Sequence, residues 1–167
     1  DSHTALWETL IHTFGPDRVK AKILLDIHPS NAFIGNLMRM DLLGTHGFLE
    51  QQIEEIKKYY LFMAKETGTF WENDNKSASL NHGFASHICH FIIRDIVGVK
   101  VDQTIKLITW QLTALAGKSF QLTLPMGDTT ACFTTEFRNK QIHYSYQIPK
   151  NYRIQIIEHT NYDSIKT

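Results

Sequence analysis

The sequence Gly68-Thr69-Phe70-Trp71-Glu72-Asn73 separates the two clearest helical patterns of the chain, and a second polar stretch, Asn81-His82-Gly83, follows it closely. Before it, apolar residues recur at steps of three and four over residues 49–67, opposite a charged face, which predicts an amphipathic helix ending at Gly68. After it, the same spacing predicts a helix over residues 83–97. We therefore interpret the stretch as the connection between two helices.

Two further helices are predicted upstream. One apolar stripe runs from Leu6 to Phe14, and a second pattern follows Ser30 and Asn31, either of which can cap exposed backbone N–H groups. The segment 18–27 fits a short helix or an extended chain, and both alternatives stay open. Medium-length helices with one apolar face each, joined by short connections, are typical of an antiparallel helical array.

The composition changes near Lys100, where β-branched and aromatic residues begin to alternate with polar ones. This alternation, with turn residues every eight to twelve positions, predicts antiparallel strands. Its clearest segments are residues 119–124, 130–137, 142–148 and 152–157. We therefore expect an α+β fold, with antiparallel helices over residues 1–99 and an antiparallel sheet or sandwich segment over residues 100–167.

The composition excludes several classes of function. The chain has 167 residues, of which 43% are hydrophobic and 20% charged, so neither disorder nor a membrane span is expected. Its 17 basic and 17 acidic residues cancel, which argues against nucleic acid as the main partner. No leader pattern is present, and we expect a soluble, untargeted chain. Cys89 and Cys132 are expected to be buried free thiols.

Glu72 is the first candidate for chemistry. A carboxylate desolvated by the neighbouring Trp71 indole suits a general acid or base, and indole faces stack on apolar sugar faces. The alternative is that Trp71 anchors the core and Glu72 is a solvated loop acid. Asn81 and His82 form the second candidate, in which His82 would bond a substrate hydroxyl; the alternative is an ordinary helix start.

A metal site is the third possibility and the weakest. His87 and His90 have the i, i+3 spacing of helical ligands, with His82 and Cys89 close in sequence. No third ligand has a recognisable spacing, and apolar residues surround these histidines. We therefore expect no metal and no cofactor.

Taken together, these segments resemble one known family, the C-terminal part of α-L-rhamnosidase-type glycoside hydrolases. The helical part carries the resemblance in His28-Pro-Ser-Asn-Ala-Phe-Ile-Gly-Asn, Gly68-Thr-Phe-Trp-Glu and Ser79-Leu-Asn-His-Gly-Phe-Ala-Ser-His. The strand part carries it in Gly117-Lys-Ser-Phe, Leu124-Pro-Met-Gly-Asp and Tyr144-Ser-Tyr-Gln-Ile-Pro-Lys-Asn-Tyr.

The resemblance implies that residues 1–99 are the last helices of an (α/α)6 barrel and residues 100–167 a C-terminal β domain. It implies an inverting glycosidase in which Glu72 is the general base, with Trp71, Asn81 and His82 at a rhamnose-type sugar. The family's general acid lies in upstream helices that this sequence does not contain, and the loop between the two motifs is shorter here than in many members. We therefore expect a fragment that is inactive alone.

The expected partners follow from this interpretation. They are a carbohydrate and either a second copy of the chain or the N-terminal part of a parent protein, with neither nucleic acid nor membrane. The alternative to the hydrolase is a non-catalytic carbohydrate-binding or interaction module of the same fold. The compartment is left open, a periplasmic or secreted bacterial parent being one alternative.

Overall fold

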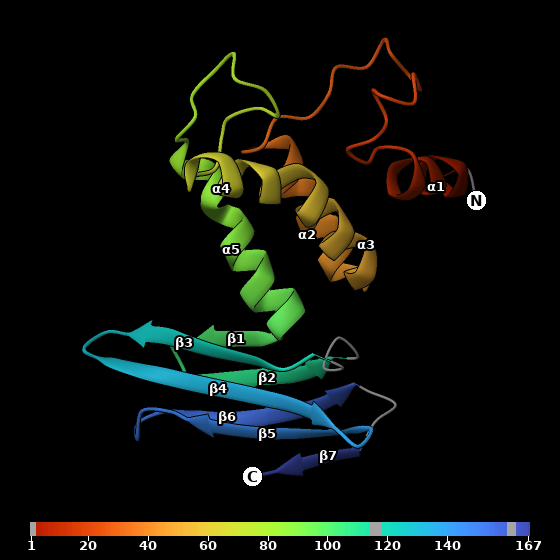
Figure 1. The fold of residues 1–167 in the computed structure, drawn as a ribbon. Helices are drawn as coiled ribbons and strands as arrows, with labels where there is room; N and C mark the ends of the chain where they lie inside the picture. The colour runs from red at the N-terminus through yellow and green to blue at the C-terminus, as the bar shows by residue number, and fades with distance from the viewer. Residues whose placement is uncertain (1–2, 114–117, 160–162) are drawn as a thin grey trace. The chain divides into compact units, whose positions relative to one another are not determined.

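The computed structural model describes residues 3–113, 118–159 and 163–167, so Gly117 of the strand motif lies outside the described residues. The chain divides into two compact units, Asp1–Phe91 and Ile92–Thr167. The first unit contains helices and long connections, and the second consists mainly of strands (Figure 1). The predicted division at residues 99 and 100, into a barrel part and a β domain, stays a prediction.

The first unit is built from short helical elements, some of which follow one another without a break. They are α1 (Thr4–His12), α2 (Gly35–Thr45), α3 (Leu49–Ile56), η1 (Lys57–Leu61), α4 (Phe62–Thr67), η2 (Gly83–Ser86) and α5 (His87–Phe91). The continuous run α3–η1–α4 agrees with the predicted helix over residues 49–67. It ends at Gly68, whose φ of 72° is a left-handed conformation that glycine adopts at little cost.

Two details of this unit concern alternatives that the sequence left open. Residues 18–27 form turns, so the segment is neither a helix nor a strand. The start of α2 is capped by Asn31, whose Oδ1 accepts the N–H groups of Ile34 at 2.9 Å and Gly35 at 3.0 Å. Asn31 therefore caps the helix, as one of the two predicted candidates.

A buried ion pair joins α1, α2 and α3. The guanidinium of Arg39 forms a two-pronged contact with the carboxylate of Glu55, and its remaining donors bond the carbonyls of Leu10 at 2.6 Å and Ile11 at 3.0 Å. Gln51 donates to the same Ile11 carbonyl and to Glu55. These bonds satisfy carbonyls at the end of α1 that have no partner within a helix.

The second unit begins with η3 (Ile92–Val97) and continues as two sheets. The strands are β1 (Val99–Asp102), β2 (Leu107–Thr113), β3 (Phe120–Met126), β4 (Thr129–Arg138), β5 (Gln141–Gln147), β6 (Arg153–His159) and β7 (Asp163–Lys166). The strand orders are β1-β2-β6 and β3-β4-β5-β7. Between β4 and β5, Asn139 and Lys140 both have positive φ, as a tight hairpin turn requires.

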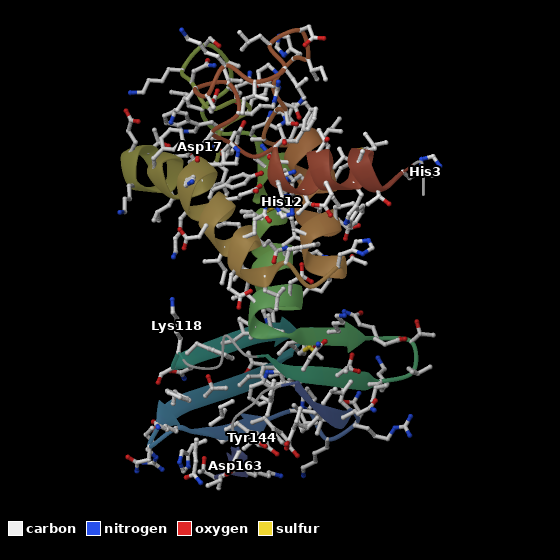
Figure 2. All side chains as sticks on the ribbon, turned by 90° about the vertical axis from the view of Figure 1, so that its right-hand side faces the viewer. His3, His12, Asp17, Lys118, Tyr144 and Asp163 are labelled. Atoms are coloured by element: carbon white, nitrogen blue, oxygen red, sulfur yellow. The ribbon has the colours of Figure 1, made fainter. Side chains whose placement is uncertain are left out.

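Trp110 of β2 lies at the centre of the core between the two sheets. Its ring meets Phe133 of β4 at 5.1 Å and Tyr144 of β5 at 5.7 Å, both edge-on, and its indole N–H bonds the carbonyl of Val97. Tyr144 is labelled within this unit in Figure 2. Because aromatic side chains of both sheets share one buried cluster, the unit is a two-layered β structure.

The predicted α+β class is confirmed, with one difference in the sheets. Most neighbouring strands are antiparallel, as expected, but β2 pairs with β6 and β5 pairs with β7 in parallel. Both pairs join strands that are not consecutive in the chain, and turn signals in a sequence report only consecutive pairings.

Candidate functional site

The Trp-Glu and Asn-His segments lie side by side. The N–H of Glu72 donates to the carbonyl of Ser79 at 2.9 Å, and the N–H of His82 donates to the carbonyl of Phe70 at 2.8 Å. The hydroxyl of Thr69 adds a bond to the carbonyl of Leu80. The polar loop between the two segments therefore turns back, and brings both predicted site motifs to one place.

A third segment, around Ala32, lies against the same place. The N–H of Ala32 donates to the carbonyl of Glu72 at 2.9 Å. The ring of Phe33 packs on the ring of His82 with centroids 4.6 Å apart. All three helical-unit motifs that carry the resemblance are thus in contact, although they span residues 28 to 87 of the chain.

Trp71 is a buried anchor of this arrangement. Its side chain is 1% exposed, its indole N–H donates to the hydroxyl of Thr67 at 2.8 Å, and its ring meets Phe62 edge-on at 5.3 Å. The ammonium group of Lys76 lies 5.9 Å from the ring centroid. In this conformation neighbouring groups cover the indole, so contact with a sugar would require the ring to be uncovered. The predicted sugar contact of Trp71 stays a prediction.

Glu72 is held through its backbone. Its N–H and its carbonyl are both hydrogen-bonded, to Ser79 and to Ala32, while the residue is only partly buried. A side chain that is partly accessible on a backbone fixed from both sides suits a group that must act on a bound molecule.

The His82 imidazole lies between aromatic rings. Phe33 is on one side, and Phe84, itself 76% exposed, has its centroid 5.9 Å away. The Nε2 atom is buried and has no hydrogen-bond partner among the described residues. Asn81 beside it is exposed, and its N–H donates to the hydroxyl of Ser79 at 3.3 Å. A buried imidazole nitrogen without a protein partner is a group that a ligand hydroxyl can satisfy.

The histidines weighed as metal ligands have other surroundings. Nε2 of His87 is bonded to the carbonyl of Ala32 at 2.8 Å, whereas His90 is exposed. In the part of the chain that the structure describes, no group of three or more His, Cys, Asp or Glu residues is arranged to hold a metal ion. Cys132 is partly buried, but Cys89, which belongs to α5, is exposed. The prediction of two buried thiols was therefore wrong.

A hollow of ≈ 190 Å³ lies near the site but is not lined by any of its four predicted residues. Its walls include Arg18, Ser30, Tyr59 and Asp74. Burial raises the pKa of Tyr59, and the nearby Asp74 carboxylate raises it further, so its hydroxyl stays protonated.

The residues that the sequence did not reveal are those that hold Ala32. Its carbonyl accepts two hydrogen bonds, from the hydroxyl of Tyr60 and from Nε2 of His87, each at 2.8 Å. Tyr60 is one of the apolar residues that recur in the predicted helix over residues 49–67, and His87 was considered only as a weak metal candidate. No local signal identifies either, because the contacts join residues 28 and 55 positions apart.

The chain is an α+β protein in which a helical unit carries a carboxylate and an imidazole on neighbouring, hydrogen-bonded segments. No protein-family model matches the chain, and neither does any curated protein. Among the described residues, no helix is both long and apolar enough to cross a membrane.

Among solved structures, the chain is similar to the GH78 family rhamnosidase of Bacillus sp. GL1. The TM-score is 0.72 at 14% sequence identity, and the match covers 92% of this chain and 18% of that chain. At this identity the likeness establishes the fold: nearly the whole chain has the architecture of a part of that rhamnosidase. The chain spans less than a fifth of the length of the protein it matches.

Proposed function

We propose that this chain is the C-terminal part of a glycoside hydrolase resembling inverting α-L-rhamnosidases, with Glu72 as the general base that activates water. The observation that carries the proposal is the contact between the Trp-Glu and Asn-His segments. Backbone hydrogen bonds join the two segments and bring Glu72 and His82 onto neighbouring stretches of the chain. The fold likeness to a rhamnosidase supports the choice of reaction class.

In this proposal each predicted residue has a role at the sugar. Glu72 removes a proton from the attacking water, and Nε2 of His82, which is buried in this conformation, bonds a sugar hydroxyl once its ring is uncovered. The amide of Asn81 offers further bonds to hydroxyls from an exposed position. Trp71 contacts the sugar only if its ring becomes uncovered, and in the conformation described here it anchors the segment that carries Glu72.

An inverting mechanism needs a second carboxyl group as general acid, about 6.5–9.5 Å from the base. We propose that this group belongs to a part of the parent protein outside the present sequence, in the preceding helices of an (α/α)6 barrel. The 167-residue chain alone then binds sugar weakly and does not cleave it. Its partners are a rhamnose-type glycoside and the protein surface that supplies the acid.

The test is the substitution Glu72→Gln in the polypeptide that carries this chain together with the upstream helices, assayed on an aryl α-L-rhamnoside. We expect kcat to fall by roughly 10²–10⁴ with little change in KM, because a general base acts mainly in the transition state. Asp74→Asn, which removes an exposed acid of the same loop, is the matched control and should keep its turnover. A Glu72→Gln enzyme that retains its kcat contradicts the proposal.

A non-catalytic sugar-binding module is the second candidate. It is favoured by the buried, unbonded Nε2 of His82, which suits binding whether or not a catalytic acid is present. Calorimetry of the 167-residue chain with rhamnose distinguishes the two. Saturable binding that His82→Phe abolishes, with no turnover in any longer form of the protein, favours the module.

A further inference from the structure

The backbone of Ala32 is a junction between two helical elements and the candidate base. Ala32 is fully buried, and its peptide groups make three hydrogen bonds. Its carbonyl accepts from the Tyr60 hydroxyl and from Nε2 of His87, both at 2.8 Å, and its N–H donates to the carbonyl of Glu72 at 2.9 Å. A carbonyl oxygen has two acceptor positions, so both are used.

We propose that Tyr60 and His87 are positioning residues for Glu72, acting through the backbone of Ala32. Tyr60 belongs to η1 and His87 to α5, so the two donors approach from separate elements and fix the carbonyl in direction as well as place. The opposite side of the same residue then holds the Glu72 carbonyl. The effect of this arrangement on catalysis by Glu72 rests on the proposed function. The fixing of the Glu72 backbone by Ala32 does not.

The arrangement requires one form of the His87 ring. Because a carbonyl can only accept, the proton must be on Nε2, which leaves Nδ1 without one in the neutral ring. That Nδ1 atom is buried and has no hydrogen-bond partner among the described residues. A second proton there would put a positive charge on a partly buried ring, which burial disfavours, so we expect the neutral Nε2–H tautomer to hold Ala32.

Packing alone does not account for these side chains. The Tyr60 ring is 1% exposed and meets Phe70 edge-on at 5.8 Å, so a phenylalanine would fill the same space. The hydroxyl adds only the bond to Ala32. The His87 ring likewise meets Phe91 and Tyr60 edge-on, and its polar atom is directed at the Ala32 carbonyl. The polar atoms of both residues thus serve one backbone group.

The first measurement uses the unmodified 167-residue chain and needs no variant to fold. NMR of the ¹⁵N-labelled imidazole should show His87 in the neutral Nε2–H tautomer at pH 7.5, and hydrogen exchange should show a protected Ala32 amide. An Nδ1–H tautomer, or an Ala32 amide that exchanges like an open loop, overturns the proposal.

The second measurement repeats the exchange experiment in variants. Tyr60→Phe and His87→Leu should each accelerate exchange at Ala32 by about fivefold, the effect of a lost hydrogen bond worth about 1 kcal/mol. His87→Gln, whose amide N–H₂ can replace the Nε2 donor, should restore most of the protection. His90→Gln, on the exposed side of the same helix, is the matched control and should leave the amide unchanged. Unchanged exchange at Ala32 in both Tyr60→Phe and His87→Leu contradicts the inference.

Turnover separates this inference from the proposed function. In the polypeptide that cleaves the rhamnoside, Tyr60→Phe and His87→Leu should lower kcat about tenfold with KM nearly constant, and His87→Gln should recover it. Faster Ala32 exchange together with a fully active Glu72→Gln enzyme refutes the general base and leaves the positioning of the Glu72 segment intact. Normal Ala32 exchange in these variants with an inactive Glu72→Gln enzyme refutes the positioning alone.

Discussion

Gly98 and Gln111 touch through their backbones at the start of the β unit. The N–H of Gln111 donates to the carbonyl of Gly98 at 2.9 Å, and a Cβ atom at position 98 would lie 2.0 Å from the carbonyl oxygen of Gln111. The φ of Gly98 is also +83°, in the region that side chains disfavour. The end of η3 can therefore approach β2 only because residue 98 has no side chain.

Gly98→Ala should lower the free energy of unfolding by roughly 3 kcal/mol, since it combines a left-handed backbone cost with a backbone clash. Gly127→Ala is the matched control, because Gly127 also has a positive φ (+68°) but no atom within 4 Å of its would-be Cβ. It should cost about 1–2 kcal/mol. Urea denaturation compares the two, and equal losses would show that the contact with Gln111 can relax.

The Arg39–Glu55 pair should be strongly coupled. Glu55→Gln and Arg39→Met should each destabilise the chain by about 3–5 kcal/mol, because each leaves a buried charge without its partner. The double variant should cost less than the sum of the two single losses. A double-mutant cycle in urea measures this coupling, and the exposed pair Lys57–Glu54 serves as control with an expected coupling below about 1 kcal/mol. If the losses in the free energy of unfolding at Arg39 and Glu55 are additive, the two side chains do not form a coupled buried pair.

Stability should fall on mild acidification through His87. Burial lowers the pKa of His87 below its ordinary value of 6.5, His90 nearby acts in the same direction, and the bond to the Ala32 carbonyl opposes the shift. The unfolded chain then binds a proton at this position before the folded chain does. The contribution of neutral His87 to the free energy of unfolding is therefore fully present above pH 6.5. It is lost as the pH falls from 6.5 through the lower pKa of His87 in the folded chain.

Two variants test this pH dependence. His87→Gln should flatten the decline in the free energy of unfolding between about pH 7 and 5, whereas His90→Gln, an exposed histidine, should leave most of it. Tyr60 is the other titratable group facing the ring, and burial raises its pKa, so it stays protonated throughout this range. An unchanged slope in His87→Gln would show that His87 is not the group responsible.

The helical unit should associate through an apolar surface. Residues 19–38 leave eight large apolar side chains exposed, namely Val19, Ile23, Leu24, Leu25, Ile27, Ile34, Leu37 and Met38. Leu25 and Met38 are 62% and 66% exposed, and a large exposed apolar area usually marks a contact with another chain or with a missing part of the same protein. We expect the chain to form oligomers at micromolar concentrations.

Light scattering during gel filtration measures this association. Leu25→Glu and Met38→Glu should shift the chain toward a 19.3 kDa monomer. Ile105→Glu, an exposed apolar residue in the other unit, should not. A monodisperse monomer of the unmodified chain at all concentrations would contradict the prediction.

Much of the local structure follows from the sequence. The spacing of apolar residues predicts the run α3–η1–α4, and its end at Gly68 follows from the conformational freedom of glycine. Strands β3, β4 and β5 follow from period-two alternation and turn residues. These signals depend on neighbouring residues, which determine which faces are apolar and where the chain can turn. The motifs around Glu72 and His82 were likewise recognisable as a pair.

Tertiary structure alone decided which distant groups meet. It paired β2 with β6 and β5 with β7, buried Trp71 against Phe62, and directed Tyr60 and His87 at the Ala32 carbonyl. Such contacts depend on how helices and strands pack in three dimensions, where residues far apart in the sequence bond the same polar group. Periodicity does not indicate such contacts, because it describes one element at a time. The sequence thus determined the elements and the candidate residues, and packing determined what holds Glu72 in place.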